Sequence, residues 1–345
     1  MRRSAVASAA LAAVVVAGGA VLAVARPWAP SEAEPVALEL EGDLAVHDPA
    51  LVVGDEGEPW FVYSTGDLRV GFGAPQIRRS DDGGRTWEPA GTAWDASGDP
   101  AWVRDPDTGI AGVENYWAPE LVEHDGTWYL YYSASTFGSN SSAIGLATAS
   151  TLDPADPDFG WTDQGMVIRS TAGTDDYNAI DPGVVTDDDG RPWLFFGSFW
   201  GGIQRVSLAW PSGKPADDAE PVTVARRSGV PDPAIEAPYV AEHDGWYYLF
   251  VSWDRCCAGE DSTYSIHVGR ARDVTGPFLD KDGRDMADGG GSLVLGTDGA
   301  RIGPGGQSLS QGYLGYHFYD GENGGAPRLG IQRLGWDDDG WPVAR

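Results

Sequence analysis

The chain has 345 residues, and 23 Lys and Arg against 52 Asp and Glu give it a formal net charge of -29 at pH 7. Nucleic-acid binding needs a surplus of cations, and an anionic membrane surface or a polyanionic polysaccharide would repel so acidic a chain. Its 48 Gly and 24 Pro are too many for a helical bundle, while 15 Trp, 13 Tyr and 10 Phe exclude a disordered chain. We therefore expect a turn-rich β-protein that acts on a neutral ligand.

The N-terminal segment has the composition of a secretory signal peptide. Two arginines follow the first methionine, and residues 5–24 form a continuous run of small and apolar residues. We predict that residues 1–26 are a signal peptide and that the protein is secreted. The alternative is an uncleaved membrane anchor formed by residues 5–24. Residues 27–42, which are acidic and contain proline, are predicted to be a linker.

The remaining residues, 43–345, are predicted to form a single catalytic domain built from a fivefold repeat. Each repeat has a small or acidic residue, a proline, an apolar pair, a turn and then an aromatic-rich strand. The repeat prolines are Pro49, Pro119, Pro182, Pro238 and Pro304. Because the aromatic segments alternate with the period of a strand buried on both faces, the sequence predicts five sheets set radially, which is an all-β, five-bladed β-propeller.

Acidic turn motifs support the blades rather than the chemistry. Asp-Gly pairs at residues 125–126, 189–190 and 244–245 separate paired strands, where a tight hairpin turn needs a positive φ. The segment SDDGGRTW at residues 80–87 resembles the Asp-box of sialidase-like propellers, in which the Asp closes a turn and the Trp packs between strands. We interpret all of these as structural features.

Carboxylates at the starts of three repeats are the candidate catalytic groups. Asp48 and Asp181 directly precede their prolines, and Glu236 lies two residues before Pro238. The first strand of a propeller blade lines the axis, so these acids are expected to converge, and like charges in one pocket raise one another's pKa. Two opposed carboxyl groups perform glycoside hydrolysis. No G-x-S-x-G motif and no cluster of histidines points to a serine or zinc hydrolase.

The same segments resemble endo-α-1,5-L-arabinanases of glycoside hydrolase family 43. They are VHDP at 46–49, YWAP at 116–119, STFGSN at 135–140, NAIDP at 178–182, GSFWGG at 197–202, IEAPY at 235–239, a stretch over 256–277, GPG at 303–305 and YH at 316–317. The resemblance covers about residues 43–343. It implies that Asp48 is the general base, Glu236 the general acid and Asp181 the carboxylate that raises the acid's pKa. The family inverts anomeric configuration, which predicts a separation of about 6.5 to 9.5 Å between base and acid.

The resemblance also implies a set of substrate contacts and a metal ligand. The predicted substrate-binding residues are Trp117, Phe137, Gly138, Asn178, Ser198, Phe199 and Trp200. Trp117 and Phe137 would offer apolar faces to the sugar rings, although both could instead be core aromatics of the blades. His317 is expected to hold a single axial cation, most simply calcium, and the alternative is a hydrogen-bonded core histidine.

Several alternatives stay open at this level. The leading hypothesis is an extracellular, monomeric endo-arabinanase that binds arabinan or arabino-oligosaccharides, with no nucleic-acid or protein partner. An exo-acting α-L-arabinofuranosidase or β-xylosidase on the same fold is the rival, followed by a sialidase and a non-catalytic carbohydrate-binding propeller. The adjacent Cys256 and Cys257 form either a vicinal disulfide or two buried thiols.

Overall fold

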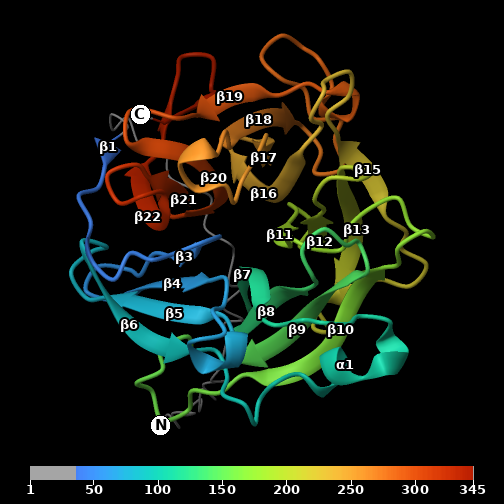
Figure 1. Cartoon of the computed structure of the whole chain (residues 1–345). Coiled ribbons are helices and arrows are strands. Elements are labelled where there is room, and N and C mark those ends of the chain that lie inside the picture. Colours follow the sequence, from blue (N-terminus) through green and yellow to red (C-terminus); the bar gives the residue numbers. More distant parts are fainter. Residues whose placement is uncertain (1–35, 345) are drawn as a thin grey trace, which may run out of the picture.

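Five β-sheets surround a central axis in the computed structural model, which describes residues 36–344 (Figure 1). The prediction of an all-β, five-bladed β-propeller is confirmed. The predicted signal peptide or anchor and the first part of the predicted linker lie outside the described residues. Among the described residues, no helix is long and apolar enough to cross a membrane.

The consecutive strands of each blade pair antiparallel, starting from an inner strand, and the inner strands contact their neighbours around the ring. Blade 1 contains β3 (Ala50–Val52), β4 (Trp60–Ser64), β5 (Gln76–Ser80) and β6 (Thr86–Thr92). Blade 2 contains β7 (Tyr116–His124), β8 (Thr127–Ala134), β9 (Ser142–Ala149) and β10 (Thr162–Ser170). Blade 3 contains β11 (Gly183–Thr186), β12 (Pro192–Phe196), β13 (Ile203–Ala209), β14 (Lys214–Pro215) and β15 (Val222–Ala225).

The last two blades follow the same plan. Blade 4 contains β16 (Ile235–His243), β17 (Trp246–Trp253), β18 (Ser265–Ala271) and β19 (Ser292–Leu295). Blade 5 contains β20 (Arg301–Ser310), β21 (Tyr313–Asp320) and β22 (Ala326–Arg333), and a separate hairpin of β23 (Gly335–Trp336) and β24 (Pro342–Val343) follows it. The helices in the described part of the chain are short: α1 (Ala101–Arg104), η1 (Gly71–Gly73), η2 (Pro106–Thr108), η3 (Gly259–Asp261) and η4 (Met286–Asp288).

The ring is closed by residues that the sequence analysis placed in the linker. β1 (Val36–Ala37) pairs with β22 as the outer strand of blade 5, and β2 (Glu41–Gly42) pairs in parallel with β6 of blade 1. Residues 36–42 therefore belong to the propeller, and the predicted domain boundary at residue 43 is wrong. Two-residue strands carry too little periodicity to be recognised, because only their pairing with distant edges defines them.

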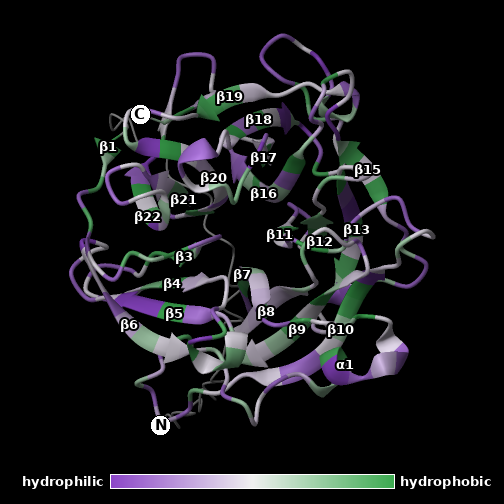
Figure 2. Ribbon diagram, in the orientation of Figure 1, coloured by the Kyte–Doolittle hydropathy of each residue, from purple (hydrophilic) through white to green (hydrophobic). Residues whose placement is uncertain are grey.

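The hydrophobic core lies between the blades. Buried side chains form five clusters, and each cluster joins two neighbouring sheets, as Tyr63 of blade 1 and Tyr132 of blade 2 do in one of them. Hydrophobic residues accordingly recur along the strands of every blade (Figure 2). This arrangement explains why the aromatic strands are buried on both faces, as at β8 and β17.

The start of every blade has an unusual backbone conformation. The residue before the repeat proline has a positive φ in all five repeats, namely Asp48 (50°), Ala118 (41°), Asp181 (57°), Ala237 (51°) and Gly303 (56°). Left-handed backbone is uncommon for residues with a Cβ. Because Ala118 and Ala237 share it, it belongs to the repeat and not to the chemistry. β-Bulges follow in blades 2, 4 and 5, and bulges redirect side chains, here at the axis.

The acidic turns are structural, as predicted. The Asp-Gly hairpins at 125–126 and 244–245 have positive φ at both residues, whereas at 189–190 only Gly190 does. At that third turn, Asp187 accepts hydrogen bonds from the backbone N–H groups of Asp189 and Arg191 instead. In the Asp-box, Asp82 accepts from the N–H groups of residues 85 and 86, and the Trp87 side chain is fully buried.

Candidate active site

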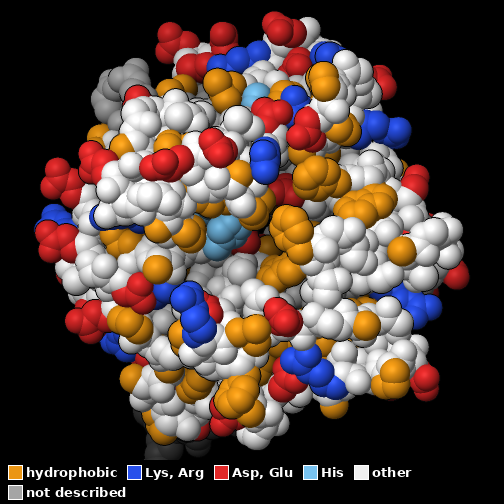
Figure 3. Space-filling view, viewed as in Figure 1, with side chains coloured by type: hydrophobic (Ala, Val, Ile, Leu, Met, Phe, Trp, Pro, Cys, Tyr) orange, Lys and Arg blue, Asp and Glu red, His pale blue; other side chains and the backbone are white. Residues whose placement is uncertain are grey.

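One large pocket opens at the centre of one face of the propeller (Figure 3). It has a volume of about 940 Å³, and its walls come from loops at the same end of several blades. All ten residues predicted to be catalytic or to contact substrate line it: Asp48, Trp117, Phe137, Gly138, Asn178, Asp181, Ser198, Phe199, Trp200 and Glu236. The fold thus brings together residues from positions 48 to 236 of the chain. Their individual roles stay predictions.

Asp48 is held by contacts with three separate parts of the chain. Its Oδ2 atom accepts hydrogen bonds from His47 Nδ1 at 2.7 Å and from Thr65 Oγ1 at 2.7 Å, and its backbone N–H donates to His317 Nδ1 at 3.1 Å. Burial by itself would raise the pKa of Asp48. The charge and hydrogen bond of His47, with smaller contributions from His317 and Thr65, instead lower this pKa below its usual value. Asp48 is therefore ionised at neutral pH.

A chain of hydrogen bonds orients the His47 ring toward Asp48. The backbone N–H of Cys257 donates to the Tyr319 hydroxyl at 2.7 Å, and that hydroxyl lies 3.0 Å from His47 Nε2. On its other side the His47 ring stacks on His317, with 3.7 Å between the ring centroids. Burial lowers the pKa of His47, but the neighbouring Asp48 raises it more, so that the net shift is upward. His47 Nδ1 is consequently held as a donor to the carboxylate.

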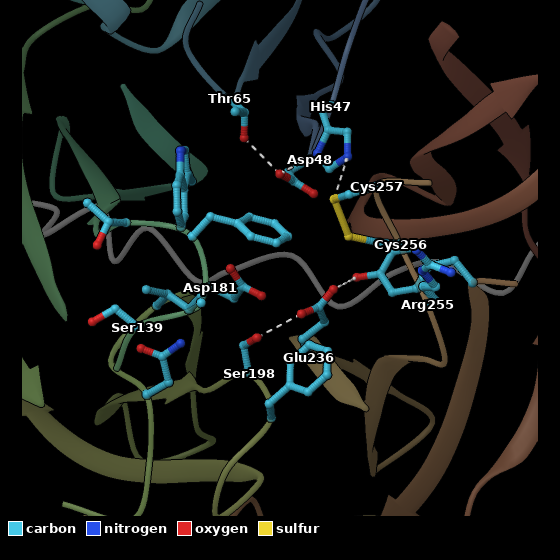
Figure 4. A pocket seen from close by; sticks show the side chains of 18 of the residues that line it. His47, Asp48, Thr65, Ser139, Asp181, Ser198, Glu236, Arg255, Cys256 and Cys257 are labelled. Atoms are coloured by element: carbon cyan, nitrogen blue, oxygen red, sulfur yellow. Dashed lines mark hydrogen bonds and ion pairs between the residues drawn. A yellow bond between two sulfur atoms is a disulfide. The ribbon is translucent and has the colours of Figure 1, made fainter. Parts of the chain in front are cut away.

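Glu236 occupies the opposite side of the site from Asp48 (Figure 4). Ser198 Oγ donates to its Oε2 at 2.7 Å, and the Tyr264 hydroxyl donates to its Oε1 at 2.7 Å. Burial is the largest influence and raises the pKa of Glu236; these two hydrogen bonds oppose the rise, and the charge of Asp48 adds to it. The net effect keeps the pKa of Glu236 above that of an ordinary glutamate.

Asp181 is the third carboxylate, placed at the start of blade 3. Its Oδ2 accepts a hydrogen bond from the backbone N–H of Ala237 at 3.1 Å, and its own N–H donates to Ser133 Oγ at 2.9 Å. Burial, followed by the charges of Glu236 and Asp48, raises the pKa of Asp181 well above its usual range. Asp181 and Glu236 thus form the part of the site that retains a proton, while Asp48 remains charged.

The residues predicted to contact sugar differ in their exposure and in the hydrogen bonds that they already make. The Phe137 side chain is 87% exposed, Trp200 50% and Phe199 40%, so these aromatics are not core residues of the blades. The Asn178 side chain is buried, and its Oδ1 atom has no hydrogen-bond partner. By contrast, the Ser198 hydroxyl already donates to Glu236, which makes it a partner of the predicted acid.

His317 lies beneath the pocket and its side chain is fully buried. Burial, and secondarily the neighbouring His47, lower its pKa to about 3, so the ring is neutral. Gly306 packs directly against it, since a Cβ at Gly306 would lie 2.8 Å from His317 Nδ1 and 2.5 Å from Asp48 Oδ1. Only a residue without a side chain fits at this position.

The surroundings of His317 fit a cation in one of its two neutral tautomers. Its Nε2 atom is buried and has no hydrogen-bond partner. When Nδ1 accepts the Asp48 N–H, the proton resides on Nε2, which then cannot bind a cation. With the proton on Nδ1, that nitrogen no longer accepts the Asp48 N–H and instead lies 3.5 Å from Asp48 Oδ1, and Nε2 presents the lone pair that a cation requires. The donor set is sparse, and water would have to complete the coordination of calcium.

The sequence analysis gave no role to four side chains that complete the site: His47, Thr65, Tyr264 and Tyr319. His47 and Tyr264 were within reach, because one adjoins Asp48 and the other lies in a segment that carries the family resemblance. Thr65 and Tyr319 gave no signal, since only the folded ring brings Thr65 to Asp48, 17 positions away, and Tyr319 to His47, 272 positions away. The question of the two cysteines is also decided: Cys256 and Cys257 form a vicinal disulfide, and both line the pocket.

The pocket of this β-propeller combines an ionised carboxylate, a pair of carboxyl groups that retains a proton, and exposed aromatic rings. This combination defines the class of protein: a carbohydrate-cleaving hydrolase. Sequence comparison then specifies the family. The profile of Glycosyl hydrolases family 43 matches residues 70–342, and the chain belongs to this family.

Individual relatives agree with the family assignment. The chain is 40% identical over 310 residues to the extracellular exo-alpha-(1->5)-L-arabinofuranosidase ArbA of Cellvibrio japonicus, covering 86% of this chain and 85% of that protein. It is 40% identical over 298 residues to the extracellular endo-alpha-(1->5)-L-arabinanase 1 of Bacillus subtilis, covering 86% and 87%. The structure of Cellvibrio cellulosa alpha-L-arabinanase complexed with arabinohexaose superposes with a TM-score of 0.78 at 38% identity, covering 87% and 95%.

Proposed function

We infer that this enzyme hydrolyses α-1,5-L-arabinofuranosidic bonds in arabinan. One observation carries the proposal: carboxylates from three blades meet in one pocket, and their surroundings separate an ionised Asp48 from a proton-retaining Asp181 and Glu236. The proposed identity of the substrate comes from relatives that are named for the cleavage of α-1,5-linked arabinose and are about 40% identical over most of the chain. A neutral polymer also suits a pocket in so acidic a protein.

In the proposed mechanism the reaction proceeds by a single displacement. Asp48 accepts a proton from a water molecule as that water attacks the anomeric carbon, and His47 and Thr65 keep the carboxylate oriented. Glu236 donates its proton to the departing glycosidic oxygen. Asp181 is buried beside Glu236, and the repulsion that two ionised carboxylates would feel there favours keeping one proton on the pair. The configuration inverts, so an α-linked substrate releases a β-anomer first.

The aromatic side chains and the amide would bind the sugar. Trp117, Phe137 and Trp200 offer apolar faces to furanose rings, while Asn178 Oδ1, buried and unpaired, is ready to accept a hydrogen bond from a sugar hydroxyl. The Gly138 backbone supplies a further polar contact, and Phe199 adds apolar surface.

His317 is the residue we propose as ligand of an axial cation, in the tautomer that frees Nε2. When bound there, a cation would supply positive charge beneath Asp48 and favour its ionised form. Metal analysis of the purified protein tests this directly: calcium in the unaltered protein and its loss in His317→Ala would support the site. An unaltered protein that contains no stoichiometric cation would refute it.

Endo action is our first choice, and exo action is the second candidate. The relatives carry both kinds of name, because the Bacillus subtilis protein is called an endo-arabinanase and the Cellvibrio japonicus protein an exo-acting arabinofuranosidase. Both are also named extracellular, which supports the proposal that this protein is secreted.

Product analysis tests the substrate and the mode of attack together. The purified protein is incubated with linear arabinan, and product sizes are followed from the first minutes. Mixed oligosaccharides at early times indicate endo action, and a single small product indicates exo action. Activity on xylan with none on arabinan would overturn the proposed substrate. Proton NMR of the first product identifies its anomer and tests the inverting mechanism.

A further inference from the structure

The Cys256–Cys257 disulfide forms part of the pocket wall beside the catalytic carboxylates. Figure 4 shows it on the other side of the pocket from Ser139, with Asp181 lying between. Its Cys257 Sγ atom lies 3.8 Å from Nε2 of His47, which hydrogen-bonds to Asp48. The disulfide is thus adjacent to the proposed general base, and its Cys257 side chain is exposed to the pocket.

The loop that carries the disulfide is held rigidly by hydrogen bonds. Arg255 and Thr263 are joined twice, through the Arg255 N–H to the Thr263 hydroxyl and the Thr263 N–H to the Arg255 carbonyl. The N–H of Ala258 donates to Ser262 Oγ at 3.0 Å, and the N–H of Cys257 donates to the Tyr319 hydroxyl. The sulfur atoms are therefore presented to the pocket at a fixed position.

A role in stability does not explain this bond. A disulfide stabilises a fold chiefly by closing a loop in the unfolded chain, and the effect grows with loop length. A bond between adjacent residues closes almost no chain. Metal binding is no better an explanation, since Cys256, Cys257 and His47 lie close enough to share an ion, but disulfide sulfurs are not the thiolates that metals bind.

The chemistry of the surface suggests a contact with sugar instead. Two bonded sulfurs offer a compact, polarisable, apolar face without a hydrogen-bond donor. The neighbouring pocket residues His47, Tyr264 and Glu236 are polar, so the disulfide is an apolar patch where the substrate must pass. Such a patch matches the C–H faces of a furanose ring, and its rigidity lowers the entropy cost of binding.

We propose that the Cys256–Cys257 disulfide is a substrate-binding wall that packs against an arabinofuranose ring next to the bond being cleaved. The inference deepens the proposed function and rests on it for the identity of the sugar. The disulfide contributes contact to bound substrate and takes no part in proton transfer.

The test replaces both cysteines and measures binding separately from turnover. In Cys256→Ala/Cys257→Ala we expect KM for arabinohexaose to rise about tenfold, given an apolar contact of roughly 50 Å². The kcat value should stay within about twofold, because the wall binds the ground state and the transition state alike. Glu260→Ala, on the same loop outside the pocket, is the matched control and should leave both constants unchanged. An unaltered KM in the double variant would overturn the proposal.

Two further measurements keep the proposal testable if the double variant does not fold. Reducing the disulfide of the unaltered protein with a phosphine should raise KM, and reoxidation should restore it. A crystal structure of Glu236→Gln with arabinohexaose should place a sugar carbon within about 4 Å of a cysteine sulfur. Sugar that remains beyond contact distance would refute the wall. If the unaltered protein cleaves xylan and not arabinan, the proposed function fails, and xylohexaose then tests the wall.

Discussion

Carboxyl groups occur both at the blade starts and in the outer turns, and their roles in the two places differ. Asp82 of the Asp-box accepts hydrogen bonds from Ser80, Arg85 and Thr86, all within four residues of it. Asp48 accepts from His47 and Thr65, and its backbone contacts His317 of another blade. Both carboxyl groups have a lowered pKa, but Asp82 owes this to its own turn and Asp48 to the assembled ring.

A lowered pKa alone therefore does not distinguish a candidate catalytic carboxylate from a turn residue. What distinguishes the blade starts is burial together with other acids in one pocket, which raises the pKa of Asp181 and Glu236 while Asp48 stays ionised. In the Asp-box, by contrast, Asp82 is held by hydrogen bonds from its own turn. The four predictions that follow test this contrast, from the largest expected effect to the smallest.

Removing either partner of the proposed acid–base pair should have the largest effect. In Glu236→Gln and in Asp48→Asn we expect kcat on arabinan to fall about a hundredfold to ten-thousandfold, because a positioned proton donor or acceptor is lost. Initial rates of reducing-sugar release measure the change. Thermal unfolding serves as the control and should show an intact fold; substantial activity in Glu236→Gln would contradict its role as the acid.

Asp181→Asn should be the next most damaging change, at about a hundredfold in kcat. Removing the Asp181 carboxyl removes the like-charge repulsion that favours a proton on the Asp181–Glu236 pair, so Glu236 gives up its proton at lower pH. The alkaline limb of the pH–activity profile should therefore move to lower pH. A profile that keeps its alkaline limb in place would show that Asp181 does not tune the acid.

Ser198→Ala should change the pH dependence more than the maximum rate. The Ser198 hydroxyl lowers the pKa of Glu236 by donating to its Oε2. Without this hydrogen bond the pKa rises, Glu236 stays protonated to higher pH, and the alkaline limb moves upward. Ser198→Thr keeps a hydroxyl and should behave like the unaltered enzyme. A downward movement in Ser198→Ala would contradict this assignment.

Asp82→Ala should leave kcat and KM unchanged and lower only the stability. Its backbone and side-chain hydrogen bonds lower the pKa of Asp82 from 3.8 to about 2. The stabilisation is therefore present above pH 3.8 and is lost as the pH falls through about 2. We expect a lower melting temperature than the unaltered protein at pH 7 and a smaller difference near pH 2. Reduced activity in the folded variant would contradict the purely structural role assigned to Asp82.

Much of the fold was predictable because its unit is repeated. Five prolines with aromatic strands behind them indicate five similar sheets, and the buried tyrosines of β8 and β17 follow from their position between neighbouring blades. The strands β1 and β2 were missed, because two residues show no period and only their partners β22 and β6 define them. The left-handed backbone before each proline was also missed, since residues with a Cβ rarely adopt it.

For the site, the three candidate acids were recognisable from the repeat, because Asp48 and Asp181 directly precede their repeat prolines and Glu236 lies one residue further from Pro238. The sequence also supplied the aromatic and amide side chains that line the pocket. The proton affinity of each acid could be read only from the folded ring. Proton affinity depends on burial and on contacts such as Thr65 with Asp48 and Tyr264 with Glu236. It was likewise the closed ring that brought Tyr319 to His47 and the Cys256–Cys257 disulfide into the pocket, because contacts between blades are not encoded in any local pattern.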